Sequence, residues 1–325
     1  MSKLYPIERS PLYKMCNRRT LANLLCLPTK YFSYEHEYQY NEFSKPKPNG
    51  NGRRDFTVPS DELKAIQKRI CRLLSRIVTP EWVMSGKKHC SYITNAEHHV
   101  DKKFVRTMDV SKFYDSVQRN YIFKMFKNTF QMAEDIAWLM TDIVTYKGVL
   151  PTGSPSSQLI VYWTYAEMFD AIKRKADEND CDFTLYVDDM TFSADHPIST
   201  EFRNEIAIQL KKNGLLAKAQ KDHYYQPGSF KVVTGVGIEN GEKKVLNNKR
   251  QKILFQYEKC KKTCNLYDIE KLNGMLCSMR QIEPDIFPEL GNYIKHYEAE
   301  LKEMARKRFY ANKRKKAKVK EKNYA

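Results

Sequence analysis

The chain has 325 residues, of which 42% are hydrophobic, so it can fold around a sizeable core as one large domain or two to three smaller ones. Lys and Arg outnumber Asp and Glu by 56 to 39, which gives a net charge of +17. This charge favours a phosphate-rich partner such as a nucleic acid. A basic protein with no nucleic-acid partner is the alternative. No apolar stretch could span a membrane, and Met1–Ser10 lacks the apolar run of a signal peptide, so a cytoplasmic protein is predicted. The eight Cys form no metal-binding pairs, which predicts free thiols.

The first third of the chain is predicted to be mainly helical. Its clearest helix is Asp61–Val78, in which Leu and Ile recur at intervals of three and four residues and form one apolar stripe. Ser60 precedes this helix as a cap, and the Thr79-Pro80 pair is expected to end it. Before it, the segment Lys45–Gly52 is rich in Pro, Asn and Gly and is typical of an exposed turn.

The middle of the chain alternates predicted strands and helices. Lys103–Val110 is expected to be a strand, and a helix is expected at Pro155–Ala176. Two β-prone runs, Phe183–Val187 and Met190–Ala194, are joined through two adjacent carboxylates and predict an antiparallel hairpin. Helices are expected to pack on one face of the small sheet that these strands form, so the predicted fold class is α+β.

The last third begins with a predicted hairpin and continues as helix. Lys231–Ile238 and Lys243–Leu246 flank Asn240-Gly241, a pair typical of a two-residue hairpin turn. After this hairpin the chain is predicted to be helical to its end. The final run, Arg306–Lys322, is dominated by Lys and Arg; we interpret it as a helical track along nucleic acid, and a solvated, disordered tail is the alternative.

Asp188 and Asp189 form the strongest local signal for a chemical site. Two adjacent carboxylates in a tight turn repel each other, and a divalent cation bound by both relieves that repulsion. A solvated Asp-Asp turn is the alternative for this pair alone. Asp109 shifts the balance, because it lies near the end of another predicted strand, and converging carboxylates are what two-metal phosphoryl transfer requires. The Val110 carbonyl is a further candidate ligand.

Three motifs in order then resemble those of reverse transcriptases. Met108–Tyr114 resembles their motif A, Leu150–Ser157 resembles motif B of the bacterial branch, and Tyr186–Asp189 resembles their YxDD motif C. This resemblance covers most of the chain and implies an RNA-directed DNA polymerase. It also implies two Mg²⁺ ions, with Mn²⁺ as a substitute, held by Asp109, Val110, Asp188 and Asp189.

The resemblance further implies a right-hand polymerase with fingers, palm and thumb. Residues 1–102 would hold the N-terminal helices, the fingers and an RNA-recognition segment. Residues 103–240 would form the palm, a small antiparallel sheet with packed helices and interleaved fingers helices. Residues 241–325 would form a basic helical thumb and tail.

Nucleotide contacts are also implied by the resemblance. Arg53 and Arg54 match the basic fingers motif that grips the incoming triphosphate, for which the guanidinium fork is suited; an exposed pair in a charged loop is the alternative. Tyr114 matches the aromatic position that blocks the ribose 2′-hydroxyl and selects dNTPs. Lys221 matches the motif D lysine that donates a proton to pyrophosphate, although a lone Lys is more often solvated.

Motif B departs from the family pattern at one position. Thr152 stands where the family has Gln, so a shorter hydroxyl side chain is left for that nucleotide contact. Gly153 follows it and is expected to let the backbone approach the nucleotide closely.

Two short signatures indicate the retron branch of the family. Asn95–His99 fits the NAxxH signature before motif A, and Val233–Gly235 fits the VTG signature after motif D. In retron enzymes these regions accompany recognition of the cognate structured RNA, so the expected RNA-binding residues are Asn95, His99, Val233, Thr234 and Gly235. Asn95 and His99 offer neutral hydrogen-bonding groups to phosphates or base edges; a satisfied turn residue is the alternative for each.

The retron resemblance implies a specific reaction and specific partners. The chain would copy a structured non-coding RNA, prime from a 2′-hydroxyl within it, and yield branched RNA–DNA (msDNA). Expected partners are that RNA, its DNA product, dNTPs and a protein effector in antiphage defence, with no membrane. The alternatives are another bacterial reverse transcriptase, of a defence-associated, abortive-infection or diversity-generating type, and a non-catalytic RNA-binding protein with a polymerase fold.

Overall fold

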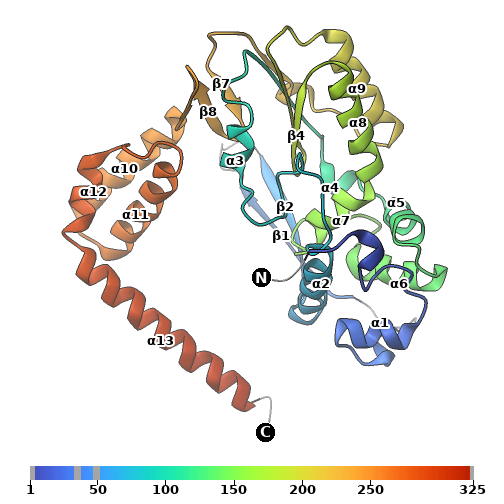
Figure 1. The fold of residues 1–325 in the computed structure, drawn as a ribbon. Helices are drawn as coiled ribbons and strands as arrows, with labels where there is room; N and C mark the ends of the chain where they lie inside the picture. The colour runs from blue at the N-terminus through green and yellow to red at the C-terminus, as the bar shows by residue number, and fades with distance from the viewer. Residues whose placement is uncertain (1–3, 33–37, 47–51, 323–325) are drawn as a thin grey trace. The chain divides into compact units, whose positions relative to one another are not determined.

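A computed structural model describes residues 4–32, 38–46 and 52–322 (Figure 1). It divides into two compact units, Met1–Ser229 and Phe230–Ala325. Each unit folds around its own buried apolar residues. The turn expected at Lys45–Gly52 lies largely outside the described residues.

The first unit mixes helices with two small sheets. In the labels of Figure 1, and with η for 3₁₀ helices except the π-helix η3, its elements in chain order are η1 (Ile7–Arg9), α1 (Arg18–Leu25), η2 (Thr29–Phe32), β1 (Tyr40–Pro46), β2 (Arg53–Pro59), α2 (Asp61–Leu74), α3 (Tyr92–Glu97), β3 (Phe104–Asp109), α4 (Phe113–Ser116), α5 (Arg119–Lys124), η3 (Met125–Thr129), α6 (Glu134–Val144), α7 (Ser157–Thr164), α8 (Ala166–Glu178), β4 (Asp182–Tyr186), β5 (Asp189–Ala194), α9 (Thr200–Lys212), η4 (Ala219–Lys221) and β6 (His223–Tyr225).

Helix α2 starts where the sequence predicts but ends at Leu74 instead of Val78. Ser60 caps it by accepting a hydrogen bond from a first-turn amide. Beyond Leu74 the backbone pairs with Tyr5: the Tyr5 amide donates to the Arg76 carbonyl at 3.0 Å, and the Val78 amide donates to the Tyr5 carbonyl at 2.9 Å. This long-range pairing overrides the local apolar pattern, so the predicted helix end at Thr79-Pro80 is wrong.

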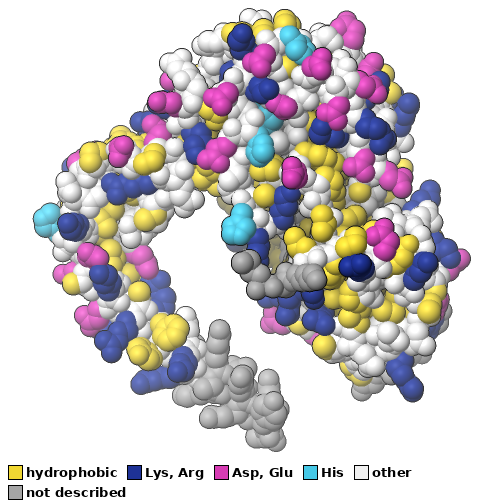
Figure 2. Space-filling view, in the orientation of Figure 1, with side chains coloured by type: hydrophobic (Ala, Val, Ile, Leu, Met, Phe, Trp, Pro, Cys, Tyr) yellow, Lys and Arg dark blue, Asp and Glu magenta, His cyan; other side chains and the backbone are white. Residues whose placement is uncertain are grey.

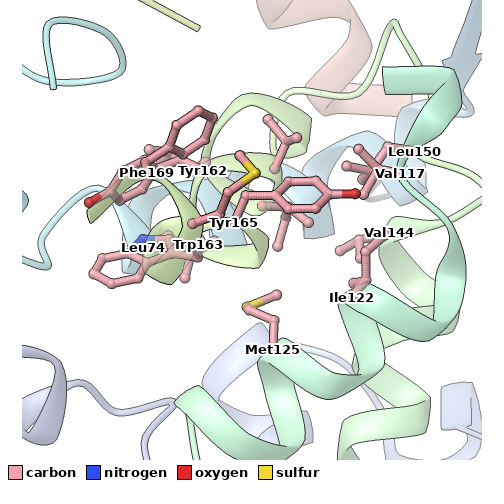
Figure 3. Packing of buried hydrophobic residues seen from close by; sticks show 14 of the residues in the cluster. Leu74, Val117, Ile122, Met125, Val144, Leu150, Tyr162, Trp163, Tyr165 and Phe169 are labelled. Atoms are coloured by element: carbon pink, nitrogen blue, oxygen red, sulfur yellow. The ribbon is translucent and has the colours of Figure 1, made fainter. Parts of the chain in front are cut away.

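The predicted helix Pro155–Ala176 consists of two helices, α7 and α8, that meet at Tyr165. At this position the backbone φ is −116°, outside the helical region. The Tyr165 ring is buried, and Figure 3 shows it among core side chains that include Ile122, Met125 and Phe169. The break between the helices lets this ring enter the core. The prediction of a single helix is therefore wrong, and the sequence did not indicate the break because it contains no Gly or Pro there.

The central sheet has two chemically different faces. Its order is β4-β5-β3-β6, and all neighbouring strands are antiparallel. Alternate side chains point to opposite faces. One face is mainly apolar and packs toward α8 and α9, as the contact between the rings of Phe192 and Phe202 shows, with centroids 5.1 Å apart. The other face carries polar side chains in register: Thr107, Asp109, Thr184, Asp189, Thr191 and Ser193.

The second unit begins with a three-stranded sheet and continues as helices. Its elements are β7 (Lys231–Val233), β8 (Val236–Glu239), β9 (Glu242–Lys244), α10 (Asn247–Thr263), α11 (Leu266–Arg280), α12 (Pro288–Lys295) and α13 (Glu298–Lys322). The predicted hairpin turn at Asn240-Gly241 is confirmed, with positive φ at both residues. The single strand predicted at Lys231–Ile238 is wrong: it is a hairpin that turns at Thr234-Gly235, both with positive φ. Thr rarely adopts that conformation, so the sequence did not signal the turn.

Helix α13 contains the basic C-terminal run, and the prediction that this run is helical is confirmed. Arg308 on α13 donates hydrogen bonds to both carboxylate oxygens of Glu270 on α11, each at 3.0 Å. Figure 2 shows Lys and Arg side chains along the described part of α13. Among the helices of the described residues, none combines the length and the apolar character that a membrane span needs.

Candidate active site

Asp109 and Asp189 lie opposite each other on neighbouring strands. β3 ends at Asp109, β5 begins at Asp189, and the antiparallel register pairs the two residues directly. Residues paired in this way have Cβ atoms about 5 Å apart. Asp109 is 3% exposed and Asp189 is half-buried. The sheet thus brings two carboxylates that are distant in the sequence into one partly enclosed site.

Val187 and Asp188 form the tight turn between β4 and β5. Val187 has a φ of +61°, in the left-handed region that a β-branched residue rarely adopts. Its amide donates a hydrogen bond to the Ser85 hydroxyl at 3.0 Å, and the Val110 amide donates to the Asp188 carbonyl at 3.3 Å. These contacts hold the turn in its strained conformation from two sides and tie it to the end of β3.

Lys221 reaches the carboxylates from the 3₁₀ helix η4. Its ammonium group forms an ion pair with the Asp109 carboxylate. The preceding backbone lies along β3, because the Lys218 amide donates to the Asp109 carbonyl at 2.8 Å and Ala217 forms a bridge with Val110. Burial lowers the pKa of Lys221, but the bond to Asp109 and the nearby carboxylates outweigh that effect, so the pKa is raised. Lys221 is therefore a cation directed at the acidic site.

Asp222 is a residue of this region that the sequence analysis missed. Its side chain is 10% exposed and accepts hydrogen bonds from Arg106 on β3, at 2.9 Å, and from Arg203 on α9. The Arg106 guanidinium also lies over the Tyr224 ring, 4.8 Å from its centroid. The network fixes the residue after Lys221 to two elements. The sequence signal for it was Arg106, a charged residue inside a predicted strand.

The acidic site holds negative charge that the protein only partly balances. The pKa of Asp189 is raised to about 7, first by burial and then by the carboxylates of Asp188 and Asp109, while Lys221 acts in the opposite direction. In the described part of the chain, no three His, Cys, Asp or Glu side chains are arranged as a complete metal-binding set. The donors themselves fit a divalent cation, since crowded carboxylate oxygens with uncompensated charge are what Mg²⁺ binds.

Thr152 and Gly153 are bound to strand β2. The Thr152 hydroxyl accepts from the Thr57 amide and donates to the Asp55 carbonyl, both at 3.3 Å, and the Gly153 amide donates to the Thr57 carbonyl at 2.9 Å. A Cβ on Gly153 would lie 2.6 Å from a Val58 methyl group. Strand β2 therefore occupies the space beside Gly153, where the sequence predicts that the backbone approaches a nucleotide.

Arg53, Arg54 and Tyr114 lie on the elements that flank this region. Arg53 and Arg54 begin β2; Arg53 is exposed and donates to the Ser44 carbonyl at 3.0 Å, across the β1–β2 hairpin. The side chain of Arg54 lies outside the described part of the structure. Tyr114 is half-buried on α4, and its ring centroid is 6.0 Å from that of the buried Phe113. Their roles toward a nucleotide stay predictions.

Asn95 and His99 do not lie on the surface. Both side chains are fully buried. Burial lowers the pKa of His99 to about 3, so its ring is neutral at physiological pH. A side chain with no exposed surface cannot touch RNA in this structure, so the expected RNA contacts of Asn95 and His99 are not supported. The types of these residues alone do not reveal such burial, because a polar side chain has the same sequence signal in the core as on the surface.

Val233, Thr234 and Gly235 form the turn region between β7 and β8 in the second unit. Val233 is buried, whereas Thr234 and Gly235 are half-buried at the turn itself. Lys249 on α10 donates a hydrogen bond to the Gly235 carbonyl at 2.9 Å and holds the turn from that helix. Of these three residues, which are all among the five expected to bind RNA, the two at the turn have accessible surface.

Residues 45–255 match the family of reverse transcriptases (RNA-dependent DNA polymerases), and this region is more than half of the chain. The chain belongs to the reverse transcriptase family. All of the motif residues described above between β2 and β8 fall within the matched region of this reverse transcriptase. The prediction of an RNA-directed DNA polymerase is confirmed at the level of the family.

Curated relatives of this reverse transcriptase are retron enzymes. The retron Se72 reverse transcriptase of Salmonella heidelberg is 24% identical over 231 residues, which are 69% of this chain and 61% of that protein. The retron Ec86 reverse transcriptase of Escherichia coli is 26% identical over 270 residues, 82% of this chain and 83% of that protein. The retron Mx65 reverse transcriptase of Myxococcus xanthus is 25% identical over 224 residues, 63% and 52% of the two chains. The predicted resemblance to retron-type enzymes is confirmed.

Proposed function

We propose that this reverse transcriptase copies a cognate structured non-coding RNA into DNA at a site formed by Asp109, Asp188 and Asp189. The observation that carries the proposal is the direct cross-strand pairing of Asp109 with Asp189, next to the turn that contains Asp188. The relatives are named as retron reverse transcriptases, which supports the proposed kind of template.

The acidic residues are proposed to hold two Mg²⁺ ions, with Mn²⁺ as a substitute. Their ligands would be the carboxylates of Asp109, Asp188 and Asp189 and the Val110 carbonyl. When bound, such ions activate the primer hydroxyl and stabilise the leaving pyrophosphate. Lys221 holds a proton on Nζ beside these carboxylates, so we assign it the role of proton donor to pyrophosphate.

Nucleotide binding is proposed to involve the segments around this site. Arg53 and Arg54 would bind the triphosphate, and Tyr114 would exclude the ribose 2′-hydroxyl. Thr152 and Gly153 bond to β2, the strand that Arg53 and Arg54 begin. Their contribution to nucleotide binding would therefore include holding that strand in place.

The remaining proposals concern organisation and biology. Residues 1–102, 103–240 and 241–325 would correspond to fingers, palm and thumb, with the Thr234-Gly235 turn as an RNA contact. Synthesis would start from a 2′-hydroxyl of the RNA and give msDNA. The protein would act in the cytoplasm in antiphage defence, together with a protein effector.

RNA-templated primer extension in Mg²⁺ tests the catalytic proposal. Asp189→Asn keeps the shape of the side chain but removes its charge, so we expect activity to fall by at least about 10³-fold, as on removal of other catalytic groups. Binding to the RNA should persist, because the substitution is small and confined to the sheet end. Asp195→Asn is the matched control, since that carboxylate follows β5 and is 61% exposed.

Sequencing of the nucleic acid that copurifies with the enzyme tests the template. DNA branched from a short structured RNA supports the retron proposal, whereas long heterogeneous DNA would assign the chain to another bacterial reverse transcriptase type.

Full activity of Asp189→Asn in the primer-extension assay would remove this residue from catalysis. RNA binding without any DNA synthesis by the unmodified chain would indicate a non-catalytic RNA-binding protein.

A further inference from the structure

His99 connects both strands of the β4–β5 hairpin, a role that the sequence analysis did not foresee. One ring nitrogen, Nδ1, lies 2.6 Å from the Ser193 hydroxyl on β5, and the other, Nε2, lies 2.7 Å from the Thr184 hydroxyl on β4. All three side chains are buried. A single ring therefore spans the hairpin that carries Asp188 and Asp189 at its turn.

The two hydroxyls lie on the same face of the sheet as the carboxylates. On β5, Ser193 and Asp189 are separated by an even number of positions, so their side chains point the same way. On β4, Thr184 is two positions before Tyr186, the cross-strand partner of Asp189. His99 thus contacts the middle of β4 and the open end of the hairpin, opposite its turn, and it does so on the polar face of the sheet.

A second set of contacts holds His99 itself. Helix α3 begins with a capping box, in which the Ser91 side chain accepts from backbone amides and the Thr94 hydroxyl accepts from the Ser91 amide. Directly after this helix, the His99 amide donates to the Ala96 carbonyl at 3.0 Å. The Asn95 side chain is buried on the same helix. The Asn95–His99 motif is therefore held by its own hydrogen bonds and by burial, and its last side chain is directed at the hairpin.

The chemistry of imidazole suits this position. A neutral ring has one nitrogen that donates and one that accepts, and a hydroxyl can take either role, so both Ser193 and Thr184 are satisfied. An apolar side chain of similar size would leave two buried hydroxyls without these bonds, which is unfavourable. The pair of bonds also depends on the distance between the two strands, so it favours one hairpin geometry.

We propose that His99 is a positioning residue for catalysis: from the polar face of the sheet it sets the geometry of the hairpin that presents Asp188 and Asp189. This inference rests on the proposed catalytic role of those carboxylates. It assigns the Asn95–His99 motif to support of the active site and not to contact with RNA.

Single-turnover primer extension separates these two roles. His99→Leu should lower the rate constant at least tenfold both on the copurified RNA and on oligo(dT)-primed poly(rA), with an unchanged dissociation constant for the RNA. His99→Gln, whose amide has a donor and an acceptor, should recover part of the rate constant. His98→Leu is the matched control, because the neighbouring His98 side chain is exposed and should leave both quantities unchanged.

Milder variants keep the test informative if His99→Leu does not fold. Thr184→Val and Ser193→Ala each remove one hydroxyl, and each should lower the rate constant in the same direction. A loss restricted to RNA affinity, or to the copurified RNA alone, would overturn the inference in favour of RNA recognition. A loss of reaction amplitude with an unchanged rate constant would mean that His99 only supports folding. Because all of these outcomes require an active parent enzyme, they are distinct from failure of the proposed function.

Discussion

At the residue scale, the carboxylate of Asp189 sits in surroundings that disfavour its charge. Burial, together with the carboxylates of Asp188 and Asp109, raises its pKa from 3.8 to about 7. Between these two pH values the folded chain holds this proton more tightly than the unfolded chain does. The contribution of Asp189 to stability is therefore greatest below about pH 4 and declines as the pH rises toward 7.

This environment predicts that Asp189→Asn stabilises the protein while it removes activity. In EDTA at pH 8 we expect the free energy of unfolding to rise by about 2 kcal/mol, because a neutral amide avoids the burial of charge. The gain should vanish at pH 4, where the aspartate itself is protonated. Urea denaturation at the two pH values measures it. Asp195→Asn, on an exposed side chain, should show no such gain, and equal stability of Asp189→Asn and the parent at pH 8 would contradict the argument.

At the element scale, the contact between the motif B segment and β2 joins two parts of the candidate site. The Gly153 amide bonds to the Thr57 carbonyl at 2.9 Å, and the Thr152 hydroxyl bonds to the backbone on either side of Phe56. There is no room for a side chain at Gly153, since a Cβ would lie 2.7 Å from that carbonyl. A change at this glycine is therefore transmitted to the strand that Arg53 begins.

We predict that Gly153→Ala lowers the free energy of unfolding by about 1–3 kcal/mol, the usual effect of overpacking. It should also raise the KM for dNTPs, because β2 must shift. Gly274→Ala is the matched control: it lies within α11 with open space around it, so it should stabilise the second unit by up to about 1 kcal/mol and leave the KM unchanged. Chemical denaturation and steady-state kinetics test both variants. An unchanged KM in Gly153→Ala would show that this contact does not affect nucleotide binding.

At the scale of the whole molecule, charge is the dominant property. The net charge is +17, and the basic run Arg306–Lys322 lies on the helix α13. Release of counterions from an RNA makes binding by such a protein strongly dependent on salt. Two readings of the basic run, a nucleic-acid track and a solvated tail, predict different effects of its removal.

If about six phosphates are neutralised, RNA affinity should fall by about 10³-fold between 50 and 200 mM salt. Fluorescence anisotropy with the copurified RNA measures this dependence. A chain that ends before Arg306 should show a shallower slope of log affinity against log salt if α13 contacts the RNA. An unchanged slope would favour the solvated tail.

The sequence predicted local structure well where local forces are sufficient. Ser60 caps α2, and Asn240-Gly241 forms a hairpin turn, both as predicted. The acidic residues of the candidate site were also predicted from the sequence, because Asp109 and the adjacent pair lie in short motifs that together resemble those of reverse transcriptases. In each case the signal lies within a few residues of the feature.

Long-range contacts account for what the sequence did not predict. The end of α2 depends on pairing with Tyr5, and the break at Tyr165 depends on burial of its ring in a core built from several helices. The hydrogen-bond network of Asp222 joins side chains from separate elements, so the charged Arg106 inside a predicted strand indicated a partner but not which residue that partner is.

By itself, the sequence predicted the family, the β4–β5 hairpin and the acidic residues of the candidate site, because these follow from short motifs and local periodicity. Only the tertiary structure decided that Asp109 faces Asp189, that Thr152 bonds to β2, and that His99 is buried against the hairpin. The physical reason is that burial and hydrogen-bond partners are set by residues far away in the chain. A polar side chain such as His99 has the same sequence signal on the surface as in the core.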